Sequence, residues 1–397
     1  MQRSSDRIIT SHVGSLPRPE DLITLLRTKD AGGSYDRRDF ERRVHQSVFD
    51  VVRRQVQGGI DVVNDGEHSK AGFSSYVRTR LGGLEPAPKG STAPPITSKD
   101  AQAFPGSYAD LAHMYNARKA RLNRGASPNN LPLICTGPVT YVGQQDLAFD
   151  LETLAAALKE NPAREGFLTA LSPTNIESYF ENWYYKTQEE FLFAIADAMH
   201  EEYKAITDAG FVLQIDDPRL ITHWDREPTI TLAENRAFIA RHVEALNHAL
   251  RGIPPETVRF HTCYSTNIAP RVHDLELKQY VDQMLLINAG GYSFEASNPR
   301  HEHEWQVWEE VKLPDDKVLL PGVVTHCSSI VEHPELVAQH LIRYASVVGR
   351  ERVIASNDCG FATSAAGDEV HPEIAWAKMS ALVGGARIAT RHLWKRG

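Results

Sequence analysis

The sequence has few of the features that mark secreted, membrane-bound or nucleic-acid-binding proteins. Four cysteines in 397 residues are too few and too dispersed for a disulfide framework, so we expect a reducing, cytoplasmic setting. No apolar run approaches the roughly 20 residues of a transmembrane helix, and the first residues, MQRSSDRIITS, lack the apolar core of a signal peptide. A formal net charge of −8 indicates no basic surface for nucleic acid. These absences favour a soluble protein whose partners are small molecules, and they leave its oligomeric state open.

Internal repeats are absent too, and the sequence instead alternates β-rich runs with stretches of helical periodicity. Several of the helical stretches end on glycine, a common helix stop. Eight such units predict an α/β fold, a (β/α)8 TIM barrel whose active site lies at the carboxyl ends of the strands. A doubly wound open sheet is the alternative, but no GxGxxG motif follows the first strand. The expected strands lie at 7–15, 60–67, 131–138, 211–217, 258–263, 292–297, 317–324 and 352–359.

Two connections are longer than a barrel requires. The first, near 67–130, contains the Pro- and Gly-rich piece EPAPKGSTAPPITSKDAQAFPG, and the second, near 139–180, contains SPTNIESYFENWYY. Long loops at the active face of a barrel commonly form lids or substrate walls, although they can also be simple elaborations of one domain. We therefore predict a single catalytic domain over 1–397 with insertions near 67–130 and 139–180.

Metal-ligating side chains stand at the ends of three expected strands. In RFHTCYS, His261 and Cys263 are two residues apart, and on a strand such positions point to the same side. Glu295 ends the sixth expected strand, and Asp358 and Cys359 end the eighth. A tetrahedral Zn²⁺ accepts nitrogen, thiolate and carboxylate ligands, whereas Mg²⁺ and Ca²⁺ prefer oxygen. The pattern predicts a zinc site, with a buried histidine beside a packed cysteine as the simpler alternative.

Eight short motifs, taken in order, resemble a known family over nearly the whole chain. They are TSHVGSLPRP, DGEHSK, TGPVTY, LQIDDP, HTC, FEAS, PGVV with VEHPELVAQHL, and NDCG. They are similar to strand ends in the catalytic barrel of cobalamin-independent methionine synthase and of epoxyalkane:coenzyme M transferase. The resemblance implies that Zn²⁺ is held by His261, Cys263, Glu295 and Cys359.

The resemblance also implies transfer of an alkyl group, a methyl group above all, to homocysteine or a similar thiol through a zinc-bound thiolate. Two cysteinate ligands would keep the substrate sulfur electron-rich, whereas zinc held by three histidines and a water would indicate hydrolysis. In the family, the amino-acid end of the thiol contacts positions that match Val13, Gly14 and Ser15. Glu67 and Asp216 match the acids that hold its ammonium group; the alternative is that they cap loops.

The alkyl-donor side departs from methionine synthase. Gln144 stands about where the family has a tryptophan that stacks on the pterin, and Thr222 stands near the position of the acid used on folate. We therefore expect a donor other than methyltetrahydrofolate. At the family's proton-donating histidine this chain has Cys327, and we predict that the adjacent His326 is the catalytic acid.

One charged segment, NPRHEHEW at 298–305, follows Glu295. Arg300 in this segment is a candidate substrate contact, and a sulfonate thiol such as coenzyme M would need Arg18 or Arg300. Opening of an epoxide or another electrophile by such a thiol is therefore an alternative function. A non-catalytic zinc- or thiol-binding protein on the same barrel is the alternative of a different class.

Overall fold

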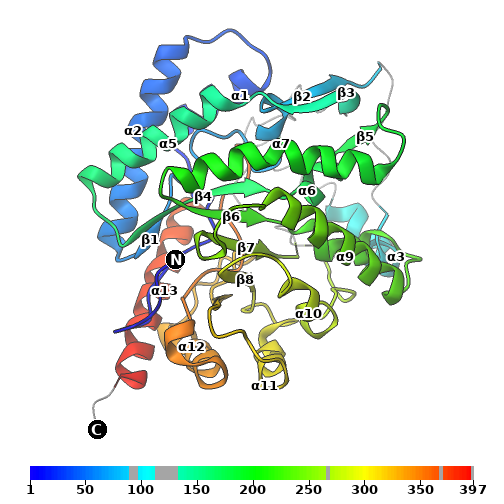
Figure 1. The fold of residues 1–397 in the computed structure, drawn as a ribbon. Helices are drawn as coiled ribbons and strands as arrows, with labels where there is room; N and C mark the ends of the chain where they lie inside the picture. Colours follow the sequence, from blue (N-terminus) through cyan, green and yellow to red (C-terminus); the bar gives the residue numbers. More distant parts are fainter. Residues whose placement is uncertain (89–96, 112–132, 265–268, 366–369, 395–397) are drawn as a thin grey trace.

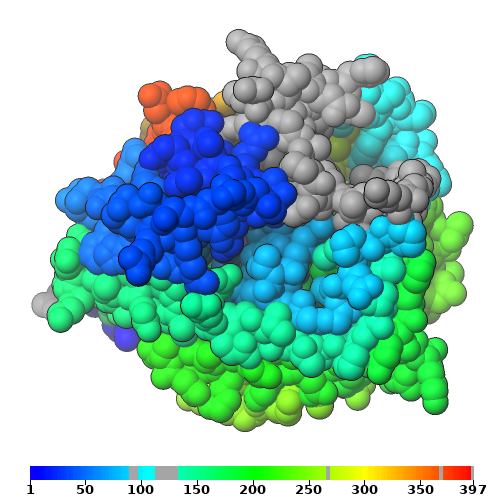
Figure 2. Space-filling view, turned by 90° about the horizontal axis from the view of Figure 1, so that it is seen from above, coloured from blue at the N-terminus to red at the C-terminus, as the bar shows by residue number. Residues whose placement is uncertain are grey.

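The computed structural model describes residues 1–88, 97–111, 133–264, 269–365 and 370–394. Helices surround a curved parallel sheet in the middle of the molecule, and the helices α2 and α13, which are far apart in sequence, lie on the same side of it (Figure 1). Seen from above, the dark blue segment of α1 and α2 lies beside the lighter blue segment of β2 (Figure 2).

The strands are β1 (Val62–Val63), β2 (Leu81–Pro86), β3 (Leu133–Tyr141), β4 (Glu165–Leu171), β5 (Phe180–Asn182), β6 (Val212–Asp216), β7 (Val258–Thr262), β8 (Gly291–Glu295) and β9 (Val318–Gly322). The longer helices are α1 (Glu20–Asp30), α2 (Arg37–Gly58), α5 (Gln144–Glu160), α7 (Gln188–Asp208), α8 (Arg219–Arg226), α9 (Leu232–Ala249), α12 (Pro334–Val348) and α13 (Pro372–Leu393). The short helices are α3 (Lys99–Ala103), α6 (Pro173–Glu177), α10 (Val281–Met284) and α11 (Val307–Glu310).

The main sheet has the strand order β1-β4-β6-β7-β8-β9, and every neighbouring pair is parallel. Beyond β9, isolated parallel bridges join Leu319 to Val353 and Thr10 to Ala355. The carbonyl of Thr10 also accepts a hydrogen bond from the backbone N–H of Val62 in β1. The two segments between β9 and β1 therefore make bridges rather than ladders, and closure into a complete (β/α)8 barrel stays a prediction.

The strand expected at 131–138 forms, but its expected place as the third strand of the barrel was wrong. Residues 133–141 form β3, which pairs with β2 and β5 in a separate sheet of three strands. Its place in the main sheet is taken by β4, Glu165–Leu171, which lies inside the expected insertion near 139–180. The run EGFLTAL is flanked by Asn-Pro at 161–162 and by Ser-Pro at 172–173, so turn residues mark this strand in the sequence as well.

Burial explains why the strands of the main sheet read as continuous apolar runs. All residues of β6, β7, β8 and β9 are buried, as expected for parallel strands covered on both faces. One apolar cluster joins side chains of β1, β4, β6 and β9 with side chains of the two bridging segments: Ile9, Val62, Phe167, Val212, Val318, Leu320 and Ile354. Standard caps delimit the surrounding helices, such as the capping box of Thr231 and Glu234 at the start of α9. The carboxyl ends of the strands are thereby held in register.

All four cysteines of the chain are free thiols, which agrees with the absence of a disulfide framework expected from the sequence. Among the described helices, none combines the length and the apolar character that crossing a membrane requires.

Candidate functional site

Strand β7 carries the first part of the site because its alternate residues share one side. Arg259, near the amino end of the strand, is fully buried. Its guanidinium lies 3.6 Å from the ring centre of Phe167 and donates a hydrogen bond of 2.7 Å to Gln214. His261 comes next, level with Asp216 of β6 in the strand register. Cys263 follows the last residue of the strand. The period of two, read from RFHTC, thus places an imidazole and a thiol at the strand end.

Three predicted ligands meet at this strand end. One ligand atom each from His261, Cys263 and Cys359 lie within 4.8 Å of one another, and all three residues are buried. The Sγ atoms of Cys263 and Cys359 are 3.2 Å apart. His261 Nδ1 lies 3.1 Å from Ser293 Oγ, while its buried Nε2 has no hydrogen-bond partner. An unsatisfied ring nitrogen beside two thiols is an arrangement that can hold a metal ion, with Ser293 orienting the ring from behind.

The ionisation of these groups supports the same interpretation. Burial, with repulsion from Arg259 and His326, lowers the pKa of His261 to about 3, so the imidazole is neutral at pH 7. The hydrogen bond with Cys263 and burial raise the pKa of Cys359 well above its usual value. A bound cation reverses the second effect, because a coordinated thiol loses its proton. The donor set of one imidazole and two thiols therefore fits Zn²⁺ better than Mg²⁺ or Ca²⁺.

Glu295, the fourth predicted ligand, is buried but does not belong to the group of three. Its Oε1 accepts a hydrogen bond of 2.7 Å from the backbone N–H of Tyr264, and its Oε2 lies 3.5 Å from Nη2 of Arg271. Asn298 donates a further hydrogen bond to Oε2. The carboxylate is thus held by protein groups beside the cluster, and its role as a ligand stays a prediction.

A cavity of about 180 Å³ opens onto the cluster. Besides the three candidate ligands, it contains four of the predicted substrate-binding residues: Val13, Ser15, Glu67 and Asp216. Its other lining residues are Phe73, Asn175, Ser178, Tyr179, Pro218, Arg219, Thr222, Arg226, Gly360 and Thr363. The structure therefore brings together residues that the sequence analysis selected on separate strand ends.

Glu67 and Asp216 form the acidic part of this cavity. Glu67 has φ of 60°, and no other described residue except glycine has a positive φ; such backbone strain is typical of functional sites. Its Oε1 accepts a hydrogen bond from Thr169 at 2.9 Å, and its buried Oε2 accepts none. Burial and the nearby Glu67 raise the pKa of Asp216 well above its usual value. Two buried carboxyl groups that repel each other favour a cationic ligand between them.

The first strand end lies against these acids. The backbone N–H of Val13 donates to Asn357 at 2.9 Å, and that of Gly14 donates to His12 at 3.2 Å. Gly14 has φ of 138°, and a Cβ there would lie 2.7 Å from a methyl carbon of Thr169, so glycine is required. Both of these N–H groups are already used, and Ser15, the third residue of the predicted segment, lines the cavity.

The other predicted residues lie outside the cavity lining. Arg300 is exposed and donates to the carbonyl of Val272 at 2.7 Å. His326 is buried, with Nε2 3.0 Å from Sγ of Cys327, and it acts electrostatically on His261. Burial, with repulsion from Glu295, raises the pKa of Cys327 to about 12, so its thiol stays protonated. The roles of Arg300 and His326 stay predictions.

Sequence reasoning missed the cationic part of the cavity. Arg219 and Arg226 of α8 line it together with Tyr179 from the segment after α6. The signal was present, because Arg219, Thr222 and Arg226 have the spacing i, i+3, i+7 directly after the LQIDDP motif. Only Thr222 was considered, as a departure from the family pattern.

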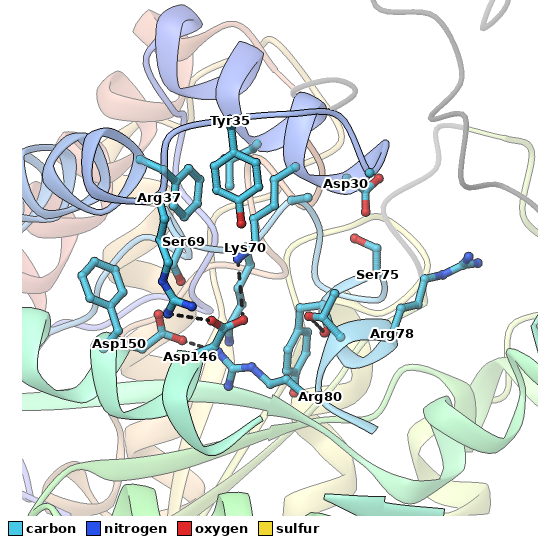
Figure 3. A pocket seen from close by; sticks show the side chains of 18 of the residues that line it. Asp30, Tyr35, Arg37, Ser69, Lys70, Ser75, Arg78, Arg80, Asp146 and Asp150 are labelled. Carbon is cyan, nitrogen blue, oxygen red and sulfur yellow. Dashed lines mark hydrogen bonds and ion pairs between the residues drawn. The ribbon is translucent and has the colours of Figure 1, made fainter. Parts of the chain in front are cut away.

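A second, larger cavity of about 440 Å³ lies between α1, α2 and the segment of β2. Figure 3 shows charged side chains facing one another across it. Arg37 and Lys29 lie 4.0 Å and 3.6 Å from carboxylate oxygens of Asp146, and Arg80 forms an ion pair with Asp150. Among the described residues, no histidine or cysteine lines it. This cavity is therefore distinct from the candidate metal centre.

Comparisons with known proteins agree with this geometry. Residues 111–382 match the family model described as "Cobalamin-independent synthase, Catalytic domain". A protein named methionine synthase from Thermococcus kodakarensis is 25% identical over 392 residues, which cover 98% of this chain and 95% of that protein. A methionine synthase from Saccharolobus islandicus is 24% identical over 399 residues, which cover 98% and 96%.

Solved structures show the same fold. A B12-independent methionine synthase from Shewanella sp. W3-18-1, in complex with selenomethionine, has a TM-score of 0.70 at 19% identity and covers 98% of this chain and 99% of its own. A putative B12-independent methionine synthase from Listeria monocytogenes has a TM-score of 0.62 at 16% identity and covers 96% and 98%.

Proposed function

Because the chain belongs to the cobalamin-independent synthase catalytic-domain family, we propose that it is a zinc-dependent transferase that moves an alkyl group, in the first instance methyl, onto the sulfur of homocysteine or a similar thiol. The observation that carries the proposal is one cavity in which an imidazole and two thiols lie beside a pair of buried acids. The relatives named methionine synthase support the methyl group and homocysteine. The proposal includes a closed barrel, for which the bridges through Thr10 and Val353 argue.

His261, Cys263 and Cys359 would hold the zinc ion, and Glu295 would be a fourth ligand in a position open to exchange. The metal supplies positive charge that lowers the pKa of a bound thiol, which normally lies near 8.5. Glu295 suits an exchangeable position because Tyr264, Asn298 and Arg271 already stabilise its carboxylate away from the cluster. Three firm protein ligands and one open position are typical of catalytic zinc.

The acids and Ser15 would bind the amino-acid end of the thiol. Glu67 and Asp216 offer buried carboxylate oxygens, of which Oε2 of Glu67 accepts no hydrogen bond. An ammonium group between them removes the repulsion that raises the pKa of Asp216. Ser15 offers a hydroxyl for the carboxylate. This arrangement favours homocysteine over a thiol without an amine.

The donor side supports a donor other than methyltetrahydrofolate. The side-chain amide of Gln144 donates to the carbonyl of Tyr141 at 3.0 Å, and the hydroxyl of Thr222 donates to the carbonyl of Pro218 at 2.9 Å. Neither group replaces an aromatic stack or an acid on a pterin ring. If the leaving atom of the donor needs a proton, the buried His326 is the candidate acid. The alternative substrate pair is coenzyme M and an epoxide, which the thiolate of coenzyme M would open.

Turnover and binding assays together test the proposal. Zinc-loaded protein is incubated with one of two thiols, homocysteine or coenzyme M. Each thiol is combined with one of three alkyl donors: methyltetrahydrofolate, a simple methyl electrophile or a small epoxide. The products are identified by mass spectrometry. We expect S-methylation of homocysteine by the simple electrophile, loss of this activity after metal removal, and no methionine from methyltetrahydrofolate. Exchange of zinc for Co²⁺ gives a readout independent of turnover, since thiolate binding changes the absorption of the metal. No spectral change with homocysteine would refute the thiol site, and binding without turnover would leave a non-catalytic thiol-binding protein.

A further inference from the structure

One face of α8 forms a wall of the active cavity. Arg219, Thr222 and Arg226 lie three and four residues apart and therefore share one side of this eight-residue helix. They line the same cavity as the His/Cys cluster and the two acids. The helix begins three residues after Asp216, so the strand end that supplies an acid also leads directly into the cationic wall.

Neither guanidinium is neutralised by the protein. No hydrogen bond or ion pair joins the side chain of Arg219 or Arg226 to another residue of the described ranges, and Nη1 of Arg219 is buried without a partner. Asp217 and Glu227 act on Arg219 electrostatically but form no ion pair with it. Burial and the neighbouring Arg226 lower the pKa of Arg219 to about 10. Arg219 is half-buried and its unpartnered Nη1 lies beside a second positive charge, so an oxyanion from outside would be stabilised there, whereas Arg226 is exposed and also hydrated.

The proposed function accounts for the thiol without this wall. Its sulfur belongs at His261, Cys263 and Cys359, and its ammonium group belongs between Glu67 and Asp216. Its carboxylate is left to Ser15. The cavity therefore has an acidic part and a cationic part, and the cationic part remains for the second substrate.

We propose that Arg219 and Arg226 bind an anionic group, a carboxylate, sulfonate or phosphate, on the alkyl donor. Guanidinium groups suit such oxyanions because their N–H donors match two oxygens at once. Tyr179 and Thr222 line the same cavity. The inference rests on the proposed function, because it assumes that the donor's alkyl carbon approaches a thiol at the cluster. In the reaction the thiolate forms the carbon–sulfur bond, and the donor leaves with the electrons of its former bond to that carbon.

A matched pair of electrophiles tests the charge preference. Iodoacetate is anionic and iodoacetamide is neutral at nearly the same size; both alkylate a thiolate with loss of iodide. Zinc-loaded protein carrying homocysteine is freed of excess thiol and treated with each reagent. The two homocysteine products are then quantified by mass spectrometry. The ratio of carboxymethyl to carbamidomethyl product is compared with the ratio for free homocysteine.

We expect the protein to raise this ratio about tenfold to a hundredfold, the range for one charge-assisted hydrogen bond. Arg219→Gln and Arg226→Gln should return the ratio toward that of the free thiol, and Arg219→Lys should retain part of the preference. Arg241→Gln is the matched control: Arg241 is exposed on α9 and does not line the cavity. Zinc content and the thermal midpoint of each variant show that it is folded and loaded.

An unchanged ratio in Arg219→Gln overturns the inference. If that variant instead loses homocysteine affinity at an unchanged ratio, the guanidinium binds the thiol's own carboxylate and the assignment to the donor is wrong. Failure of the proposed function has a different signature: the protein would then not accelerate alkylation of homocysteine by neutral iodoacetamide at all.

Discussion

The two described cavities differ in how their charges are satisfied. In the larger cavity, of about 440 Å³, Arg37, Lys29 and Arg80 each lie within ion-pair distance of an aspartate. In the smaller cavity, of about 180 Å³, Nη1 of Arg219 is buried without a hydrogen bond, and Oε2 of Glu67 accepts none, although Nη2 of Arg18 lies 4.0 Å from it. The smaller cavity also contains the His/Cys cluster.

By this difference the smaller cavity, rather than the larger one, is the candidate functional site. Charges that are paired within the protein stabilise the fold and have little left to offer a ligand. Buried polar groups without partners are unfavourable in the free protein and become favourable only when a ligand satisfies them. Substitutions should therefore separate the two cavities: those in the larger one should change stability, and those in the smaller one should change metal and substrate binding.

The largest expected effect is loss of the metal. Cys263→Ser and Cys359→Ser each remove a thiolate, for which a serine hydroxyl is a poor substitute at zinc, and we expect zinc and activity to be lost together. Cys135→Ser is the control, since Cys135 is a buried cysteine of β3 outside the cluster. Metal analysis of the purified variants decides the question; full zinc occupancy in both cluster variants would refute the site.

The second effect concerns the larger cavity. Arg80 contacts Glu202 at 3.2 Å as well as Asp150, and all three side chains are buried. Arg80→Leu leaves two buried carboxylates without their cation, which should lower the free energy of unfolding by about 3–5 kcal/mol. Urea unfolding measures the loss. Zinc content of the folded variant should be unchanged. A variant of normal stability with reduced thiol binding would contradict the assignment of a structural role to the larger cavity.

A third effect is a pH-dependent contribution to stability from His301, which lies outside the lining of both cavities. His301 lies between Asp274 and Glu304, 3.1 Å and 2.9 Å away, and stacks on Tyr264. Burial opposes its charge, but these hydrogen bonds prevail and raise the pKa of His301 to about 9. Because the pKa is raised in the folded state, the stabilisation is complete below about pH 6.5, the ordinary histidine value, and is lost as pH rises toward 9.

His301→Gln should therefore lose about 3 kcal/mol at pH 6 and much less at pH 9. Urea unfolding of the wild type and the variant at both pH values gives the difference directly. Equal losses at the two pH values would show that the imidazole is neutral in the folded protein.

The smallest effect distinguishes the acids of the two cavities. Glu67→Gln removes one charge from the proposed ammonium site and should weaken homocysteine binding by about 1.5–3 kcal/mol, with zinc content unchanged. A thiol without an amine should lose nothing. Asp146→Asn removes the same charge in the larger cavity, where Asp146 pairs with Arg37, and should not change thiol affinity. Calorimetric titration of both variants checks the comparison, and equal affinities in Glu67→Gln and wild type would contradict the role of Glu67.

Much of the site could be predicted from sequence because parallel strands end at a common edge. His261, Cys263 and Cys359 were selected from their positions after apolar runs and lie together in the structure. The third strand was misplaced because β3 has the stronger β-rich pattern, although its partners are β2 and β5. The cationic wall was missed because the spacing of Arg219 and Arg226 on a short helix is also that of a solvated face.

The sequence by itself determined the local features of this protein: the alternation of strands and helices, the period of two that aligns His261 and Cys263, and the position of Glu67 at the end of the second expected strand. These depend on backbone geometry and on neighbouring residues, so they can be read from short stretches. Only the tertiary structure decided which charges are paired. Arg80 forms an ion pair with Asp150, whereas Arg219 forms none with the residues that the structure describes, and both outcomes depend on distances between segments far apart in the chain. Packing sets those distances, and it leaves the unsatisfied charges at the small cavity beside the candidate metal centre.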